Sequence, residues 1–414
     1  MTLMRAVLAA LLVSALAHVA APPQARAEDG GAAGGPHRAE TTAPVIGGTA
    51  VPAGKWPDVA AVNFAGEQGC TGTLIAPTVV LTAGHCLESA SEPSSVVVGT
   101  SSLARIAEGE VLPVIKRVEY PSSLTSYDVG VLVLGTPSRF APRAIATGWA
   151  SLEIQNGAEV AIVGYGAIDR DANQYTSDMQ EALTTITDAG CTAKAGCNTA
   201  ALPNGELGAG GAGIDTCPGD SGGPLFSVTS FGTFLAGVTS RGYDDNTYYC
   251  SEGGIDVRPD KIVAWIEEVA GVPVGRGPEP TLDEPLAAVT GHAAEALLTA
   301  NDPIGEGHTF TITTPPAAGS AAIRADGLLR VCTGPAAGTD TIGVTITDKA
   351  NPARSLTVTL PVTVAEGEAG ATCDPADFQT SDGGGCCEAG RGAGGSWPLA
   401  IGVLVALRRR RRAA

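Results

Sequence analysis

The chain has 414 residues, more than one ordinary domain of roughly 100–200 residues requires, so we expect two or three structural units. Hydrophobic residues make up 44% of the sequence and aromatic residues 4%, and the 55 glycines favour a turn-rich β protein. The formal net charge of −18 argues against a nucleic acid as partner; it fits either cationic substrates or the solubility of an exported protein.

Residues 1–27 have the organisation of a secretory signal peptide. Arg5 provides the charged start, an apolar run extends from Ala6 to Ala21, and Ala25-Arg26-Ala27 fits a cleavage site. A permanent membrane anchor is the competing interpretation, and the Pro22-Pro23 break argues against it. Export would place the ten cysteines in an oxidising compartment, where they can form disulfides.

The next two segments differ in their apolar pattern. Residues 28–44 are rich in Gly, Ala and Thr without an apolar period, which predicts a propeptide or linker. Residues 45–271 contain short apolar runs such as Val129–Leu134 between Gly and Pro residues, a spacing typical of a β-barrel or sandwich. This region ends with a helix signal, because Pro259 precedes apolar residues at helical spacing and Gly271 follows them.

A second β region follows a break in composition. Residues 272–285 are rich in Pro, Gly and acidic side chains, which predicts a linker of moderate stiffness. Residues 286–365 show strand alternation, which predicts a small β-sandwich. The stretches Ile312–Pro316 and Thr345–Asp348 resemble the immunoglobulin- or cadherin-like modules of bacterial surface proteins.

The tail, residues 366–414, has three parts in sequence. A Gly- and Cys-rich stretch with Cys386-Cys387 precedes an apolar segment from Trp397 to Leu407, and Arg408–Arg412 follow. The apolar segment is shorter than the ~20 residues of a helical membrane span. This order resembles the C-terminal sorting tag of myxobacterial surface proteins, which implies processing by sorting machinery and attachment to the cell surface at the outer membrane. A frayed basic terminus is the alternative.

Peptide hydrolysis by a serine needs a nucleophile, a base, an acid that holds the base, and donors for the oxyanion. Cys217–Pro224 (CPGDSGGP) offers the nucleophile, because its glycines permit a tight turn that exposes the Ser221 hydroxyl and gathers backbone N–H groups. In Leu81–Cys86 (LTAGHC), His85 lies beside Cys86, whose natural partner is the upstream Cys70.

The third motif, Tyr127–Leu134 (YDVGVLVL), places Asp128 at the mouth of an apolar strand. An unpartnered carboxylate is costly to bury there, so we expect Asp128 to pair with a base such as His85.

These three motifs, in the order His85, Asp128 and Ser221, resemble the trypsin family of serine proteases over residues 45–271. The resemblance implies a double six-stranded β-barrel, with His85 and Asp128 on the first barrel and Ser221 on the second. It implies that Ser221 attacks the carbonyl, His85 transfers the proton and Asp128 fixes the imidazole. The N–H groups of Gly219 and Ser221 would form the oxyanion hole.

The same resemblance implies a primary specificity pocket. Asp215 stands where trypsin-like enzymes have the acid that binds substrate Arg or Lys, the alternative being a solvated loop aspartate. The expected pocket walls are Ser240, Gly242 and Gly254. The sequence departs from the family at Arg241, in place of a usual Trp, and at Asp256, in place of a usual Tyr, so either residue could alter the field in the pocket.

Val45-Ile46-Gly47-Gly48 resembles the start of the mature enzyme in this family. In the family, the freed amino group pairs with the acid just before the nucleophile, which here is Asp220. Pro44 precedes the cut, which argues against self-activation by an Arg-cleaving enzyme. We expect that another protease cuts between Pro44 and Val45, or that it cuts upstream and trimming follows.

The family pattern implies the disulfides Cys70–Cys86, Cys191–Cys197 and Cys217–Cys250. Cys332 is expected to pair with Cys373. The triad requires no cofactor, and we assign no metal ligand. We therefore expect a hydrolase, a secreted endopeptidase acting on protein or peptide substrates; the alternative is a surface adhesin that uses an inactive protease domain for binding.

Overall fold

We analysed a computed structural model, which describes residues 44–88, 92–121, 127–198, 205–368 and 373–378. The predicted signal peptide, the predicted propeptide apart from Pro44, and the predicted sorting tail from residue 379 onward lie outside the described residues. Within these ranges, no helix is both long enough and apolar enough to cross a membrane.

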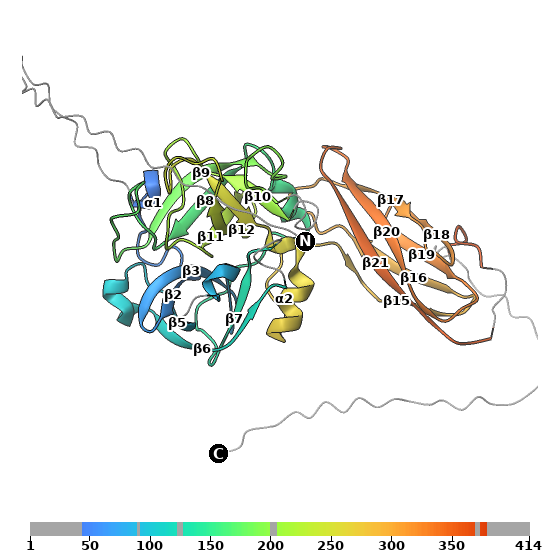
Figure 1. Ribbon diagram of the computed structural model, residues 1–414. Helices are drawn as coiled ribbons and strands as arrows, with labels where there is room; N and C mark the ends of the chain where they lie inside the picture. Colours follow the sequence, from blue (N-terminus) through green and yellow to red (C-terminus); the bar gives the residue numbers. More distant parts are fainter. Residues whose placement is uncertain (1–43, 89–91, 122–126, 199–204, 369–372, 379–414) are drawn as a thin grey trace, which may run out of the picture. The chain divides into compact units, whose positions relative to one another are not determined.

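The first barrel, blue to cyan in Figure 1, is a closed antiparallel barrel. Its strands are β2 (Val59–Phe64), β3 (Glu67–Ala76), β4 (Val79–Thr82), β5 (Pro93–Val98), β6 (Glu110–Glu119) and β7 (Gly130–Leu134). The neighbour order is β2-β3-β4-β7-β6-β5, and pairing of β5 with β2 closes the barrel. Its core is built from inward-facing apolar side chains, among them Val62, Leu74, Val80, Val96 and Leu132.

The second barrel, green to yellow in Figure 1, repeats this design. Its strands are β8 (Glu159–Gly164), β9 (Gln180–Asp188), β10 (Glu206–Ala209), β11 (Pro224–Thr229), β12 (Gly232–Gly242) and β13 (Gly254–Val257). The order is β9-β10-β13-β12-β11-β8, and β8 pairs with β9 to close it. The predicted double six-stranded barrel is therefore confirmed.

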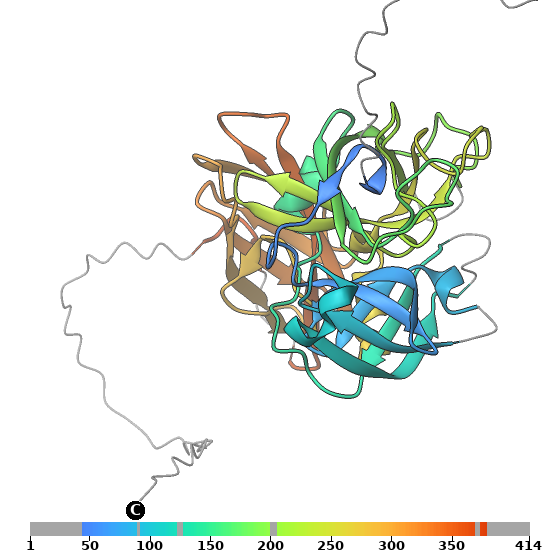
Figure 2. The same cartoon turned by 90° about the vertical axis from the view of Figure 1, so that its left-hand side faces the viewer.

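The N-terminal segment of the described chain packs against the second barrel, although it precedes the first barrel in sequence. A short turn, α1 (Pro44–Gly47), leads into β1 (Thr49–Ala50), which pairs with β9 at the edge of the second barrel. Figure 2 shows this blue segment lying beside green strands of that barrel. The predicted new amino terminus at Val45 therefore lies against the barrel that carries Ser221.

The two barrels share one buried apolar core. Val59, Ile75 and Leu81 of the first barrel belong to the same cluster as Met179 and Phe226 of the second. This core fixes the facing ends of the barrel strands, from which the functional side chains project.

The helical segments are short. They are η1 (Gly84–Cys86), η2 (Leu103–Glu108), η3 (Gly148–Glu153), η4 (Pro259–Lys261) and α2 (Val263–Ala270). The predicted C-terminal helix is confirmed as α2, which ends at Gly271 with φ of 72°, a left-handed conformation that suits glycine. Pro259 begins the 3-10 turn η4 rather than α2, so the α-helix starts later than the sequence signal indicates.

The predicted C-terminal β region forms two four-stranded sheets, orange in Figure 1. One has the order β14 (Thr281–Leu282), β16 (Ala293–Thr299), β19 (Leu328–Thr333) and β18 (Gly319–Ile323). The other has the order β15 (Leu286–Val289), β21 (Ser355–Ala365), β20 (Gly338–Asp348) and β17 (His308–Thr314). Side chains of both sheets, such as Leu298, Leu329, Val344 and Val362, share one apolar core.

Candidate active site

His85 and Asp128 come together because of the strand register of the first barrel. Strands β4 and β7 are antiparallel partners, and Thr82 of β4 lies opposite Gly130 of β7. His85 follows the end of β4 and Asp128 precedes the start of β7, so both side chains emerge at one edge. His85 Nδ1 lies 2.8 Å from Asp128 Oδ2, and the His85 backbone N–H donates to Asp128 Oδ1 at 2.8 Å.

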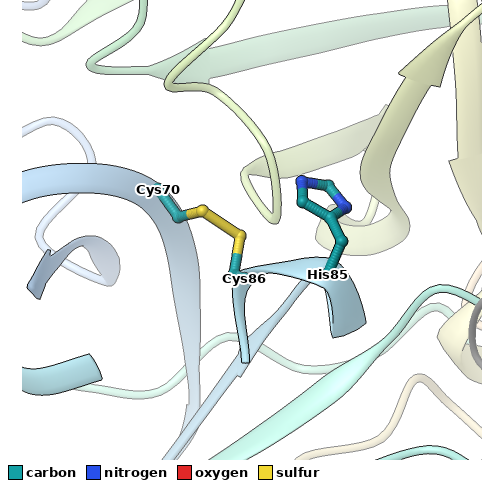
Figure 3. A group of neighbouring side chains, drawn as sticks. All are labelled: Cys70, His85 and Cys86. Atoms are coloured by element: carbon teal, nitrogen blue, oxygen red, sulfur yellow. A yellow bond between two sulfur atoms is a disulfide. The ribbon is translucent and has the colours of Figure 1, made fainter. Parts of the chain in front are cut away.

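The Cys70–Cys86 disulfide ties this edge to the neighbouring strand β3. Figure 3 shows the disulfide beside the His85 imidazole. Potential ligand atoms of Cys70, His85 and Cys86 lie within 4.8 Å of one another, a spacing compatible with a metal ion. Both sulfur atoms are bonded to each other, so the group lacks the free thiolates that such a site would use. Its role is to hold the turn that carries His85.

Asp128 has a second partner in the second barrel. The Ser240 hydroxyl donates to Asp128 Oδ2 at 2.6 Å. Burial alone pushes the pKa of Asp128 upward, but the hydrogen bond and charge of His85, together with the Ser240 hydrogen bond, hold the pKa below its ordinary value. Asp128 is therefore suited to remain an anion beside the imidazole.

The contact with Asp128 that lowers the pKa of Asp128 raises the pKa of His85. Burial lowers this pKa, whereas the hydrogen bond and negative charge of Asp128 raise it, and the net effect is a raised pKa. Asp128 thus stabilises the imidazolium that a base forms when it accepts a proton.

Ser221 lies in a tight loop that packs against the end of β4. Gly222 has φ of 81°, and a Cβ at this position would come within 2.1 Å of Thr82 Oγ1 and 2.5 Å of the Ala83 nitrogen. The glycine therefore permits the close approach of the two barrels next to His85. His85 and Ser221 line one cavity of about 690 Å³, together with residues that include Phe64, Gln68, Cys70, Pro218 and Gly219.

The loop before Ser221 is fixed by strand β3. The Gly219 carbonyl accepts hydrogen bonds from Gln68 Nε2 at 2.9 Å and from Thr71 Oγ1 at 2.8 Å, and the Thr71 N–H donates to the Ser221 carbonyl at 2.8 Å. Gly219 has φ of 101°, which a side chain disfavours, and a Cβ there would lie 2.9 Å from Gly166 Cα. Gln68, Thr71 and Gly166 had no signal in the sequence motifs.

Asp220 and Val45 are both buried, at 1% and 2% exposure. Among the described residues, the contacts of the Asp220 carboxylate are the N–H groups of Gly166 at 2.7 Å and Cys217 at 2.9 Å. Burial raises the pKa of Asp220 to about 7. The segment after Val45 reaches the pocket loop directly, because the Asp215 N–H donates to the Ile46 carbonyl at 3.2 Å.

Asp215 is buried and held by backbone donors. Its Oδ1 accepts from the Thr216 N–H at 2.8 Å and its Oδ2 from the Gly253 N–H at 2.9 Å. Burial raises the pKa of Asp215 to about 6, despite these bonds. Asp215 is therefore not the solvated loop aspartate of the alternative interpretation, since its exposure is 4%.

The expected pocket walls come from paired strands. Gly242 at the end of β12 lies opposite Gly254 at the start of β13, and Ser240 lies two positions before Gly242. The disulfide between Cys217 and Cys250 links the nucleophile loop to the segment before β13.

Asp256, on β13, is buried and accepts a hydrogen bond from Thr239 Oγ1 at 3.3 Å. Burial, with a smaller contribution from the charge of Asp215, raises the pKa of Asp256 to about 7.

Arg241 makes a contact that the sequence motifs did not indicate. Its guanidinium forms two parallel hydrogen bonds with Glu206, at 3.0 Å and 3.1 Å, and also donates to Ser240 Oγ at 3.1 Å and to the Gly196 carbonyl at 2.8 Å. Glu206 begins β10 and is 2% exposed. The one sequence signal that could have identified it is an acidic residue at the start of an apolar strand, where a cation is needed.

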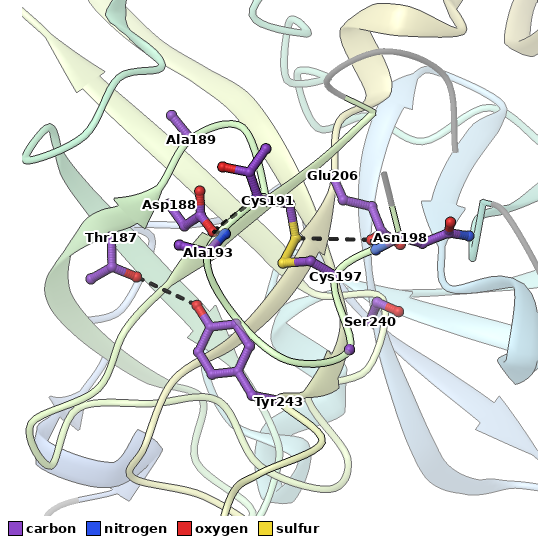
Figure 4. Close-up of a disulfide and its surroundings, with 12 residues drawn as sticks. Thr187, Asp188, Ala189, Cys191, Ala193, Cys197, Asn198, Glu206, Ser240 and Tyr243 are labelled. Carbon is purple, nitrogen blue, oxygen red and sulfur yellow. Dashed lines mark hydrogen bonds between the residues drawn. A yellow bond between two sulfur atoms is a disulfide. The ribbon is translucent and has the colours of Figure 1, made fainter. Parts of the chain in front are cut away.

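Four disulfides join cysteines of the described part of the chain: Cys70–Cys86, Cys191–Cys197, Cys217–Cys250 and Cys332–Cys373. The Cys191–Cys197 bridge lies beside Glu206 in Figure 4. The vicinal pair Cys386-Cys387 lies outside the described residues.

Comparison with known proteins agrees with this geometry. The family model described as Trypsin matches residues 45–266, more than half of the chain. The chain belongs to the trypsin family of serine proteases. The match covers both barrels and the first half of α2, so this trypsin-family domain includes every residue of the site described above.

Relatives are similar to this chain over slightly more than half of its length. Trypsin alpha of Drosophila erecta is 29% identical over 230 residues, covering 55% of this chain and 87% of the relative. Transmembrane protease serine 11E of Mus musculus is 28% identical over 246 residues, covering 56% of each chain. Glucanase inhibitor protein 3 of Phytophthora infestans is 30% identical over 235 residues, covering 54% of this chain and 88% of the relative.

Proposed function

We propose that the protein is a secreted serine endopeptidase in which His85, Asp128 and Ser221 form the catalytic triad. The observation that carries this proposal is the 2.8 Å contact between His85 Nδ1 and Asp128 Oδ2, beside a cavity that Ser221 also lines. A base oriented by a carboxylate next to a serine hydroxyl is the arrangement that activates a serine for attack on a carbonyl.

The steps follow from the positions of the groups. Ser221 attacks the substrate carbonyl while His85 accepts its proton, and Asp128 stabilises the imidazolium. The N–H groups of Gly219 and Ser221 stabilise the oxyanion of the tetrahedral intermediate. His85 then protonates the leaving amine, and water hydrolyses the acyl-enzyme by the same steps in reverse order.

We propose that the enzyme cleaves after Arg in preference to Lys, with Asp215 as the acceptor. A buried carboxylate held by two backbone donors gains from a cation, and the planar guanidinium can form two hydrogen bonds with it. The shorter reach of a lysine ammonium would favour a bridging water. Ser240, Gly242 and Gly254 form the walls along which the substrate side chain extends.

We propose that activation requires a cut between Pro44 and Val45 by another protease. The freed Val45 ammonium would pair with Asp220, a buried carboxylate whose described partners are two backbone N–H groups. Val45 in the uncut chain has φ of 39°, a left-handed conformation that is unfavourable for a β-branched residue. Cutting would release this strain.

The alternative is a protein that uses the same fold for binding without catalysis. The relative named Glucanase inhibitor protein 3 carries a name for inhibition, so family membership alone does not establish hydrolysis. The His85–Asp128 contact and the Ser240 hydroxyl that supports it favour the enzyme, because a binding protein gains nothing from an oriented imidazole.

A fluorophosphonate probe tests the proposal, because labelling requires an activated serine. The mature protein beginning at Val45 should be labelled, and Ser221→Ala and His85→Ala should each abolish the label. His292→Ala, in the turn between β15 and β16, is the matched control and should leave labelling unchanged. Correctly folded mature protein that takes no label would support the binding alternative.

We also propose that residues 1–27 direct export and that the tail, residues 366–414, is processed for attachment to the outer membrane. Mass spectrometry of the exported protein should find a chain that lacks residues 1–27 and carries a modified end near Cys386. An intact tail ending at Ala414 on surface-exposed protein would contradict this part of the proposal.

A further inference from the structure

The half-buried Arg241 and the buried Glu206 form an ion pair next to the triad. Glu206 Oε1 and Oε2 each accept one hydrogen bond from Arg241, and the Asn198 N–H adds a third at 2.8 Å to Oε2. Figure 4 shows Glu206, Asn198 and Ser240 gathered beside the Cys191–Cys197 disulfide. These hydrogen bonds fix the orientation of the Glu206 carboxylate, which in turn fixes the orientation of the Arg241 guanidinium.

The guanidinium constrains the one proton of the Ser240 hydroxyl. Arg241 Nη1 donates to Ser240 Oγ at 3.1 Å, so this oxygen acts there as an acceptor. A serine hydroxyl has a single proton to donate. The Ser240 proton is therefore directed to its other neighbour, Asp128 Oδ2, at 2.6 Å.

We propose that Arg241 is a positioning residue of the catalytic site: held by Glu206, it orients the Ser240 hydroxyl and, through it, the Asp128 carboxylate. The chain of contacts runs from Glu206 through Arg241 and Ser240 to Asp128 and His85, and each link is a hydrogen bond of 2.6 to 3.1 Å. This inference rests on the proposed triad. It adds to that triad two residues, on β10 and β12, that do not touch the reacting atoms.

The charges around His85 give the inference a second readout. Asp128 and Glu88 raise the pKa of His85, and Arg241 lowers it. Burial, the hydrogen bond with Glu88 and the charges of Glu88 and Asp128 together raise the pKa of Glu119. Loss of the Arg241 cation should therefore raise the pKa of His85. The acid limb of kcat/KM should then move to higher pH.

The test replaces the ion pair as a unit, because Arg241→Met alone would leave Glu206 buried without a cation. The double variant Arg241→Met/Glu206→Gln is compared with a matched pair elsewhere in the domain. Arg143 binds Asp58 through two hydrogen bonds of 2.9 and 2.8 Å and, like Arg241, donates to a backbone carbonyl. Arg143→Met/Asp58→Asn thus removes a similar pair that has no contact with the triad.

In mature enzyme corrected for active-site concentration, the Arg241/Glu206 variant should lower kcat about tenfold, the value of one charge-assisted hydrogen bond, with a smaller change in KM. The acid limb of its kcat/KM profile should shift to higher pH. Arg241→Lys keeps the charge but loses the planar guanidinium. Its kcat should lie between that of the double variant and that of the unsubstituted enzyme. The Arg143/Asp58 control should leave kcat and the pH profile unchanged.

An NMR titration of the His85 imidazole on Ser221→Ala protein measures the same pKa without turnover. This titration distinguishes failure of the proposed function from failure of the positioning role of Arg241. A protein without hydrolytic activity would refute the proposed function, but the titration would still show whether Arg241 acts on His85. An unchanged kcat together with an unchanged His85 pKa in the Arg241/Glu206 variant would overturn the inference. Equal effects from the Arg143/Asp58 control would overturn it as well.

Discussion

The uncut precursor should be less stable than the mature enzyme, by a margin that grows between about pH 4 and about pH 7. The change tested is the cut between Pro44 and Val45, which frees the α-ammonium of Val45 to pair with the Asp220 carboxylate. In the uncut chain the buried Asp220 carboxyl has its pKa raised from 3.8 to about 7. That difference corresponds to about 4 kcal/mol of destabilisation once the group is ionised.

The pH window follows from the direction of this shift. Below about pH 4, Asp220 is protonated in both the folded and the unfolded precursor, and the destabilisation is absent. Between about pH 4 and pH 7 the unfolded chain releases the proton first, so the folded precursor loses stability as pH rises. In the proposed mature enzyme, the Val45 ammonium would offset this loss until it is itself deprotonated, above the ordinary range of about 7.7–8.0 for an α-amino group.

The assay compares two chains that carry Ser221→Ala, which prevents self-digestion: a precursor beginning at Glu28 and a mature form beginning at Val45. Guanidinium unfolding gives the free energy of unfolding at pH 4.5 and pH 7.5. The mature form should be more stable at pH 7.5, by up to about 4 kcal/mol, and the difference should shrink at pH 4.5. Asp220→Asn in the precursor is the control, and it should remove this pH dependence.

Two results would refute this reasoning. One is an equal free energy of unfolding for precursor and mature form at both pH values, which would mean that the Val45 ammonium does not stabilise a buried Asp220 carboxylate. The other is full hydrolytic activity in an active-serine precursor that retains residues 28–44, as established by N-terminal sequencing.

Three further predictions concern single residues of the site. Asp128→Asn should keep the fold but lower kcat roughly 10⁴-fold, as expected for a Ser-His-Asp triad, because the amide favours the wrong imidazole tautomer; steady-state kinetics measures this. Asp215→Ser should abolish the Arg preference in a peptide library, and in Ser221→Ala protein a guanidinium ligand should bind more weakly below about pH 6, where Asp215 takes up a proton. Gly219→Ala should lower kcat about 10²–10³-fold, because its Cβ would meet Gly166 at 2.9 Å and displace the oxyanion donor.

The features predictable from sequence are those set by local patterns. The apolar run after Asp128 becomes β7, and the run before His85 becomes β4. Their antiparallel register then brings the two side chains together, although no local pattern states which strands pair. The glycines around Ser221 were predicted for a tight turn, and Gly219 and Gly222 do have positive φ.

The Arg241–Glu206 pair could not be predicted in the same way. The two residues are 35 positions apart, and their strands β12 and β10 are separated in the barrel by β13. Neither residue belongs to a motif. The sequence identified Arg241 as a departure from the family, but its partner depends on barrel closure.

Three buried acids of the second barrel differ in the cation that each would meet in the proposed enzyme. Glu206 has Arg241 within the chain, Asp220 would gain the Val45 ammonium after the cut, and Asp215 would meet the substrate guanidinium. Asp256 has a hydroxyl partner, Thr239, and its pKa is raised to about 7. Below that pH it is neutral. In the proposed pocket, Asp256 would therefore add little negative charge in mildly acidic solution, and the proposed preference for Arg would depend on Asp215, whose pKa is raised less.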